Sequence, residues 1–144
     1  MNRFRTFVLT AVVVATPAVA RPVIAPPKVV VERFLADYAA ERIAPMADYI
    51  APDAVMRVPF SPTGPATLSA AQATAYLQSV FAQYQSIVLS DVAVTPAADG
   101  RTVFVEAQAT YTNHAGETHR VGSIWAIEVV RGKIVRSRTY TVPA

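Results

Sequence analysis

Few residues of this sequence have the chemistry for a reactive site, and a histidine is the best placed of them. His119 lies in the alternating stretch 118–142, where it shares one face of an expected strand with Ser123 and Trp125. Imidazole titrates near neutral pH, so His119 is a candidate general base. No carboxylate shares its face. The plainer interpretation is therefore a solvated or hydrogen-bonded histidine at the edge of the sheet.

Two other polar groupings carry weaker signals. His114, Glu117 and His119 are close in sequence, but they span a turn and lack a metal-ligand spacing, so no metal site and no cofactor is expected. Ser123 lies among apolar neighbours, where it either donates a hydrogen bond to a ligand or leaves room beside Trp125. A nucleophilic serine needs a base and an orienting acid, and only His119 is at hand.

The element that positions these side chains is an expected β-hairpin. Two runs rich in β-branched and aromatic residues flank Arg131-Gly132, which is a turn signal. Arg120 and Glu128 fall on one side of the first strand, so the alternate residues, Ser123 and Trp125 among them, face the interior. An isolated hairpin is not stable in water, so further strands or a helix must cover it.

The rest of the chain supplies both kinds of element. Helical spacing of apolar residues predicts helices over 28–42, 44–50 and about 69–83, the last opened by a capping box of Ser69 and Gln72. Alternation predicts strands over 54–60, 86–95 and 102–112, and the Pro- and Gly-rich segment 61–67 is expected to be a loop. Helices followed by a run of strands predict an α+β fold, with the helices on one face of an antiparallel sheet.

The first twenty residues have the pattern of a secretory signal peptide. Arg3 and Arg5 precede a short apolar run, and Ala18-Val19-Ala20 is a typical cleavage site. The run is shorter than the roughly 20 residues that span a bilayer, so we expect cleavage after Ala20 and no membrane attachment afterwards. The sequence thus predicts a bacterial periplasmic or secreted protein with a signal peptide at 1–20, a Pro-rich lead-in at 21–27 and one domain at 28–144.

Composition narrows the class of partner. The chain has 144 residues, 53% of them hydrophobic and 16% charged, which allows a sizeable core. Loss of Arg3 and Arg5 lowers the formal net charge from +3 to about +1, so nucleic acid is not an expected partner. There is no cysteine, which excludes disulfides, thiolate metal sites and cysteine nucleophiles.

The order of elements resembles the nuclear transport factor 2-like superfamily, and within it most nearly the SnoaL-like polyketide cyclases. The residues that carry the resemblance are Val31-Glu32-Arg33-Phe34, Ile50-Ala51-Pro52-Asp53-Ala54-Val55, Ala73-Thr74-Ala75-Tyr76-Leu77, Gly132-Lys133-Ile134-Val135 and Arg138-Thr139-Tyr140. The resemblance implies a cone-shaped curved antiparallel sheet packed on about three N-terminal helices, a cystatin-like arrangement. It also implies an apolar pocket at the wide end, and a homodimer formed through the outer face of the sheet.

The resemblance can be tested on the residues of one enzyme of the superfamily. Ketosteroid isomerase uses an Asp base, with a Tyr and a protonated Asp as the oxyanion hole. By motif position these fall on Val58, Phe34 and Ser123. Phe has no hydroxyl, Val accepts no proton and Ser does not replace the acid. Isomerase chemistry of that kind is therefore not expected.

Inward-facing residues are expected to line the pocket. Any one of the aromatic residues among them would otherwise be ordinary core, but in an open cone it also borders the cavity. The expected lining residues are Phe34, Tyr38, Met56, Val58, Phe60, Tyr76, Val80, Ser123 and Trp125.

Three functions follow from this arrangement. The first is an exported domain that binds a small, mostly apolar molecule in the pocket without chemistry of its own. The second is an isomerase, cyclase or hydratase that uses His119 as base and Ser123 or Tyr76 as hydrogen-bond donor. The third is an interaction domain that uses an apolar strip on the outer sheet face, made by Gly122, Ile124, Ala126 and Val130.

Overall fold

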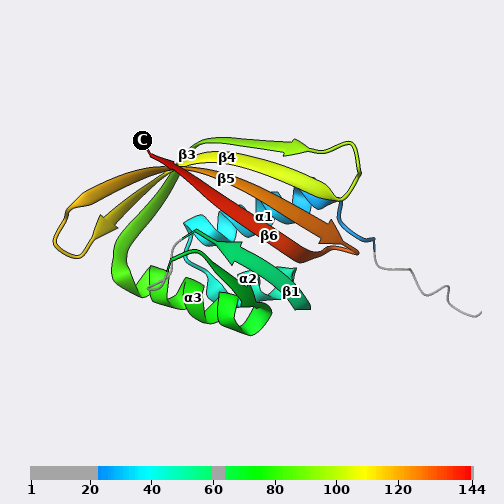
Figure 1. Cartoon of the computed structure of the whole chain (residues 1–144), viewed down its shortest axis with the longest axis horizontal. Helices are drawn as coiled ribbons and strands as arrows, with labels where there is room; N and C mark the ends of the chain where they lie inside the picture. Colours follow the sequence, from blue (N-terminus) through cyan, green and yellow to red (C-terminus); the bar gives the residue numbers. More distant parts are fainter. Residues whose placement is uncertain (1–22, 60–63, 144) are drawn as a thin grey trace, which may run out of the picture.

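A computed structural model describes residues 23–59 and 64–143 of the protein. The expected signal peptide, residues 21 and 22 of the lead-in, and Phe60 lie outside this part. The described elements are α1 (Pro27–Ala39), α2 (Ile43–Tyr49), β1 (Ile50–Val58), β2 (Ala66–Ser69), α3 (Ala70–Gln83), β3 (Tyr84–Pro96), β4 (Thr102–Asn113), β5 (Thr118–Val130) and β6 (Lys133–Pro143), as Figure 1 shows. No helix in this part is long and apolar enough to cross a membrane.

The strands form one sheet in the order β2-β1-β6-β5-β4-β3. The predicted meander of β3 to β6 is confirmed, because each of these strands pairs antiparallel with the next. The expectation of a wholly antiparallel sheet is wrong at one place. Strand β1 runs parallel to β6, with Val55 opposite Arg136, so the sheet is mixed.

The start of the sheet also differs from the prediction. The sequence predicts a helix over 44–50 and a strand from residue 54, but β1 already begins at Ile50. Proline has no backbone N–H to give to a ladder. Pro52 is accommodated because the β1–β6 pairing has an irregularity between Ile50 and Val55. The short strand β2 begins at Ala66, inside the segment expected to be a loop, and pairs with the end of β1.

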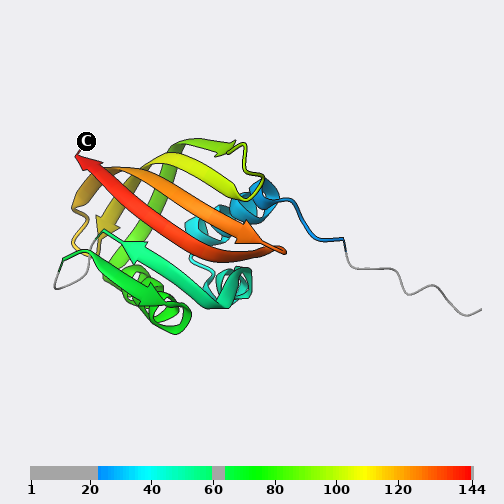
Figure 2. The same ribbon diagram turned by 45° about the vertical axis from the view of Figure 1, so that its right-hand side comes forward.

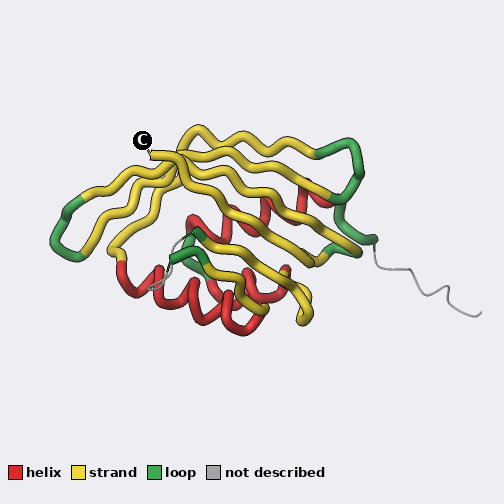
Figure 3. The backbone as a smooth tube through the Cα atoms, viewed as in Figure 1, coloured by secondary structure: helices red, strands yellow, loops and turns green. Residues whose placement is uncertain are grey.

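The sheet curves around the helices, which lie on its concave side (Figures 1, 2 and 3). Strand β3 contributes to this shape through a β-bulge between Ser90 and Ala93. Asp91 lies in the bulge with a φ of 52°, a left-handed conformation that Asp tolerates better than most residues. A bulge bends its strand and increases the local twist, so the sheet can wrap over α1.

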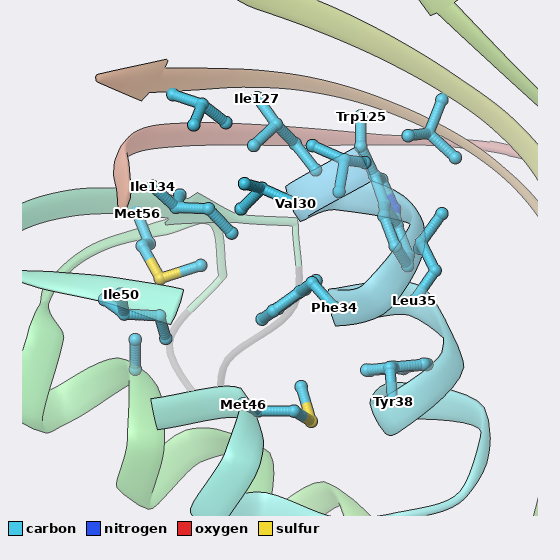
Figure 4. Packing of buried hydrophobic residues seen from close by; sticks show 14 of the residues in the cluster. Val30, Phe34, Leu35, Tyr38, Met46, Ile50, Met56, Trp125, Ile127 and Ile134 are labelled. Carbon is cyan, nitrogen blue, oxygen red and sulfur yellow. The ribbon is translucent and has the colours of Figure 1, made fainter. Parts of the chain in front are cut away.

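Helix α1 is the centre of the hydrophobic core. Pro27 fits its first turn, where no N–H is needed, and apolar residues of α1 recur at helical spacing toward the sheet. Val31 and Ile134 are both 0% exposed, and Met46 is 1% exposed. Each such side chain stabilises the fold by about 1.5–3 kcal/mol relative to an exposed position. Figure 4 shows this packing between α1, α2 and the strands.

Polar contacts fix the ends of the helices. The predicted capping box of α3 is confirmed, since the Ser69 N–H donates to Gln72 Oε1 at 2.9 Å and the Gln72 N–H donates to Ser69 Oγ at 3.4 Å. At the C-terminal end of α1, the side chain of the buried Asp37 forms an ion pair with the side chain of Arg42. The backbone N–H of Arg42 also donates a hydrogen bond to the backbone carbonyl of Asp37, at 2.9 Å. This pair holds the α1–α2 turn in place directly beside Tyr38.

Candidate functional site

A cavity of about 540 Å³ lies between α1, α3 and the concave face of the sheet. Its walls come from α1, α3, β1, β4, β5 and β6, and from residues at the α3–β3 junction. Ser79, Gln83 and His119 line it and are themselves exposed, so the cavity reaches the surface where α3 ends and β5 begins.

The structure brings the predicted pocket residues together around this one space. Apart from Phe60, which is not described, all of them line the cavity: Phe34, Tyr38, Met56, Val58, Tyr76, Val80, Ser123 and Trp125. His119 joins them at the exposed side. Alternation along strands and helical spacing therefore identified which side chains face inward.

Several lining residues were missed, although a signal for them was present. In the sequence, Tyr111 alternates with Val103, Val105, Ala107 and Ala109 on one side of β4, and Ser137, Thr139 and Thr141 share one side of β6. Tyr84 completed the apolar face of the third helix. All five line the cavity. What the pattern could not indicate is which inward residues pack against α1 and which face empty space.

An aromatic cluster makes one wall of the cavity. The ring of Tyr38 lies edge-on to Phe81 and Trp125, with centroids 5.4 and 5.6 Å away. Tyr84 and Tyr111 pack together at 4.9 Å, and the hydroxyls of Tyr38 and Tyr111 are 3.4 Å apart. Edge-to-face pairs of this kind stabilise by about 0.5–1.5 kcal/mol beyond the area they bury.

The tyrosines of this wall hold their protons more tightly than free tyrosine does. Burial, followed by the proximity of Tyr111, raises the pKa of Tyr38 well above its ordinary value of 10.0. Burial likewise raises the pKa of Tyr76 and of Tyr111. A phenolate would lose its hydration here, so these side chains remain neutral hydrogen-bonding groups at physiological pH.

A second wall carries aliphatic hydroxyls. In the β5–β6 ladder Ser123 lies opposite Thr141, Trp125 opposite Thr139 and Ile127 opposite Ser137. Ser123 and Ser137 are each only 6% exposed. Beside this row, the indole Nε1 of Trp125 is buried and has no hydrogen-bond partner among the described residues. The site therefore mixes apolar surface with hydrogen-bonding groups, as small-molecule sites do.

Formal charge is nearly absent from the walls. Among the described lining residues there is no Asp, Glu, Lys or Arg, and His119 is the one side chain with a basic nitrogen. It lies directly opposite Tyr111 in the β4–β5 ladder. The positions matched to the isomerase residues, Phe34, Val58 and Ser123, do line the cavity, but with side chains that cannot perform that reaction.

The residues considered for a metal site have other contacts. A ring nitrogen of His114 lies 3.1 Å from the carbonyl oxygen of Ala82, at the end of α3. Glu117 accepts a hydrogen bond from the Asn113 side chain at 2.7 Å. In residues 23–59 and 64–143 no three or more His, Cys, Asp or Glu side chains gather as a possible metal site.

The model of the SnoaL-like domain family matches residues 31–137, and the chain belongs to that family. No curated protein matches the sequence.

Solved structures share the fold at low sequence identity. A proposed polyketide cyclase of Xanthomonas campestris pv. campestris is 20% identical, with 79% of this chain and 88% of that chain covered and a TM-score of 0.70. A proposed isomerase of Bacillus subtilis is 24% identical, with 81% and 86% covered and a TM-score of 0.70. A nuclear transport factor 2-like protein of Anabaena variabilis is 17% identical, with 82% and 90% covered and a TM-score of 0.70. At these identities the likeness establishes the fold.

Proposed function

We propose that this domain binds a small, mostly apolar molecule in its cavity and does not catalyse the isomerase reaction. One observation carries the proposal: the cavity has aromatic and aliphatic walls with hydroxyl groups, and its described lining residues include no Asp, Glu, Lys or Arg. Its volume of about 540 Å³ is within the roughly 300–1,000 Å³ of typical small-molecule sites.

Native mass spectrometry of residues 21–144, purified from the periplasm of the native host, tests this function. A stoichiometric small-molecule adduct is expected. Thr139→Phe places a ring in the cavity and should remove the adduct. Thr95→Phe is the matched control, since Thr95 is exposed on β3, and should keep it. A protein without adduct that also binds none of a panel of apolar compounds in solution contradicts the proposal.

The binding function is proposed to operate outside the cytoplasm. Residues 1–20 carry the signal-peptide pattern, and a mature chain would then begin at Arg21. Cell fractionation and N-terminal sequencing test this. Mature protein starting at Arg21 in the periplasm or medium is the expected result, and an intact N-terminus in the cytoplasm is the opposing one.

An enzymatic role for His119 is the second candidate. His119 lines the cavity opposite Tyr111, where it can reach a bound molecule from the exposed side. Relatives of the same fold bear the names polyketide cyclase and isomerase. A general base of this kind should exchange protons next to a ketone carbonyl for deuterium in heavy water. Exchange that is abolished in His119→Ala supports the role, and equal exchange in both proteins excludes it.

A homodimer through the outer sheet face is a third candidate. Ile124, Tyr140 and Val142 are 40%, 48% and 47% exposed, and Ile124 lies opposite Tyr140 in the ladder. Exposed apolar side chains that gather on one face are typical of interfaces. Sedimentation velocity should find a dimer that Ile124→Lys dissociates. Val23→Lys, at an exposed apolar residue of the N-terminal lead-in, should leave it unchanged.

A further inference from the structure

The hydroxyls of Tyr38 and Tyr111 meet at the cavity in an unusually loose contact. Their oxygens are 3.4 Å apart, whereas a well-formed O–H···O bond is about 2.7–2.8 Å long. In the described part of the chain this is the one hydrogen bond that either hydroxyl makes. A weak mutual contact leaves donor capacity that an oxygen atom of a bound molecule can use.

One hydrogen-bond donor beside this pair also has no acceptor. The Trp125 indole N–H, on a ring edge-on to Tyr38, has no partner among the described residues, and an indole can donate but not accept. Among the described lining residues no carboxylate is present to accept from these groups. A ligand that supplies an acceptor oxygen therefore complements the wall better than a pure hydrocarbon does.

Charge on the ligand is disfavoured by the same walls. A carboxylate that enters the cavity loses water, and no Lys or Arg among the described lining residues compensates for that loss. The buried tyrosines also keep their protons, because burial raises their pKa, so they remain donors and do not become anions themselves. His119 is the one base among the described lining residues, and it lies at the exposed side, away from the Trp125–Tyr38 contact along β5.

We propose that the cavity selects uncharged ring compounds that carry a hydrogen-bond-accepting oxygen, and that Tyr38 and Tyr111 together bind this oxygen. The edge-to-face aromatic wall receives the ring, and the two hydroxyls turn from each other toward the acceptor. This inference rests on the proposed binding function. It names the chemical class of the ligand and the two residues that determine its specificity.

Three compounds with one bicyclic frame test the inference: 2-tetralone, tetralin and tetralin-2-carboxylate. The chain has a single tryptophan, Trp125, in the cavity wall, so its fluorescence reports binding, and calorimetry gives the affinity. We expect 2-tetralone to bind about tenfold more tightly than tetralin, and the carboxylate to bind most weakly. Tyr38→Phe and Tyr111→Phe should each weaken 2-tetralone binding by about three- to tenfold and leave tetralin binding unchanged.

Tyr49→Phe is the matched control, because Tyr49 ends α2 and is not among the described residues that line the cavity. It should bind 2-tetralone as the unmodified protein does. Circular dichroism establishes that each variant is folded. Equal affinity for tetralin and 2-tetralone, or tightest binding of the carboxylate, overturns this inference while the binding function stands. Failure of all three compounds to bind counts against both.

Discussion

The two ends of the concave sheet face use the same strands for opposite purposes. At the packed end the inward side chains of the strands are aliphatic. Val103, Val129 and Ile134 of the strands, and Val31 of α1, are between 0% and 2% exposed. At the cavity end, the inward side chains of the same strands are Tyr111, Ser123, Thr139 and Thr141, together with His119. Alternation is unbroken along β4 and β5, whereas in β6 a register irregularity between Ile134 and Arg136 separates the two ends. What changes is the chemistry of the side chain, from groups that need close packing to groups that can meet a ligand.

This comparison predicts a division between stability and binding. Groups at the packed end bury apolar area against α1, so their loss should lower the free energy of unfolding. Groups at the cavity end border empty space, so their loss should alter binding with little effect on stability. The predictions that follow test this division, from the largest expected effect to the smallest.

Truncation of a side chain at the packed end should lower the free energy of unfolding the most. Ile134→Ala should lower the free energy of unfolding by about 2–5 kcal/mol, because Ile134 is fully buried and its loss leaves a hole under α1. Ser123→Ala, its counterpart at the cavity end, should cost less than about 1 kcal/mol. Urea denaturation followed by circular dichroism measures both. Equal losses would remove the distinction between the two ends.

A polar contact should hold the cavity end of α1 in place. Arg42→Ala should lower the free energy of unfolding by about 1–3 kcal/mol, because it leaves the buried Asp37 carboxylate without its cationic partner. Addition of Asp37→Asn should recover much of this loss, since an amide needs no counter-charge. Urea denaturation of the single and double variants gives the result. A double variant that is no more stable than Arg42→Ala alone contradicts the explanation.

Alkaline pH should lower the free energy of unfolding through the tyrosines at the cavity end. The unfolded chain releases tyrosine protons near the ordinary pKa of 10.0, whereas the folded protein keeps them, because burial raises the pKa of Tyr38, Tyr76 and Tyr111. The unfolded state then binds fewer protons, so stability present below pH 10 falls as the pH rises further. Urea midpoints between pH 8 and 11, read with tyrosinate absorbance, measure this. Tyr38→Phe should show a shallower decline, and an identical decline would contradict the assignment.

The smallest effect is expected at an exposed turn beside the packed end. Asp99 accepts hydrogen bonds from the Thr102 hydroxyl and N–H and from the Arg101 N–H, and these lower its pKa to about 2. The stabilisation is present above the ordinary pKa of 3.8 and disappears as the pH falls through about 2. Asp99→Ala should therefore lower the melting temperature slightly at pH 7 and by much less at pH 2, which differential scanning calorimetry measures.

The sequence predicted which segments form helices and strands better than it predicted which strands pair with each other. Helical spacing and alternation are local properties, so α1, α3 and the meander of β3 to β6 were identified from residue order. Pro52 concealed the start of β1, because proline is compatible with a strand only at an irregularity that pairing with β6 creates. Strand β2 has four residues beside a Pro- and Gly-rich segment, too few to show a period.

The candidate site was predictable to a similar extent and for the same reason. Periodicity shows that Tyr76 and Ser123 face inward, but the empty space they border depends on how far α3 lies from the sheet. Tyr38 and Tyr111 come from α1 and β4, and no local pattern indicates that their hydroxyls meet. Their contact is a tertiary property, created by the curvature of the sheet over α1.

The parallel pairing of β1 with β6 has a consequence for the order in which the protein assembles. Strands β3, β4 and β5 need only their own turns to pair, so this part of the sheet can form while synthesis is still under way. β1 and β2 form a two-stranded ribbon that is marginal alone, and β1 meets its other neighbour only after β6 has been made. Closure of the sheet is thus a late, long-range event, and the rate at which β6 inserts between β1 and β5 should limit the rate of folding.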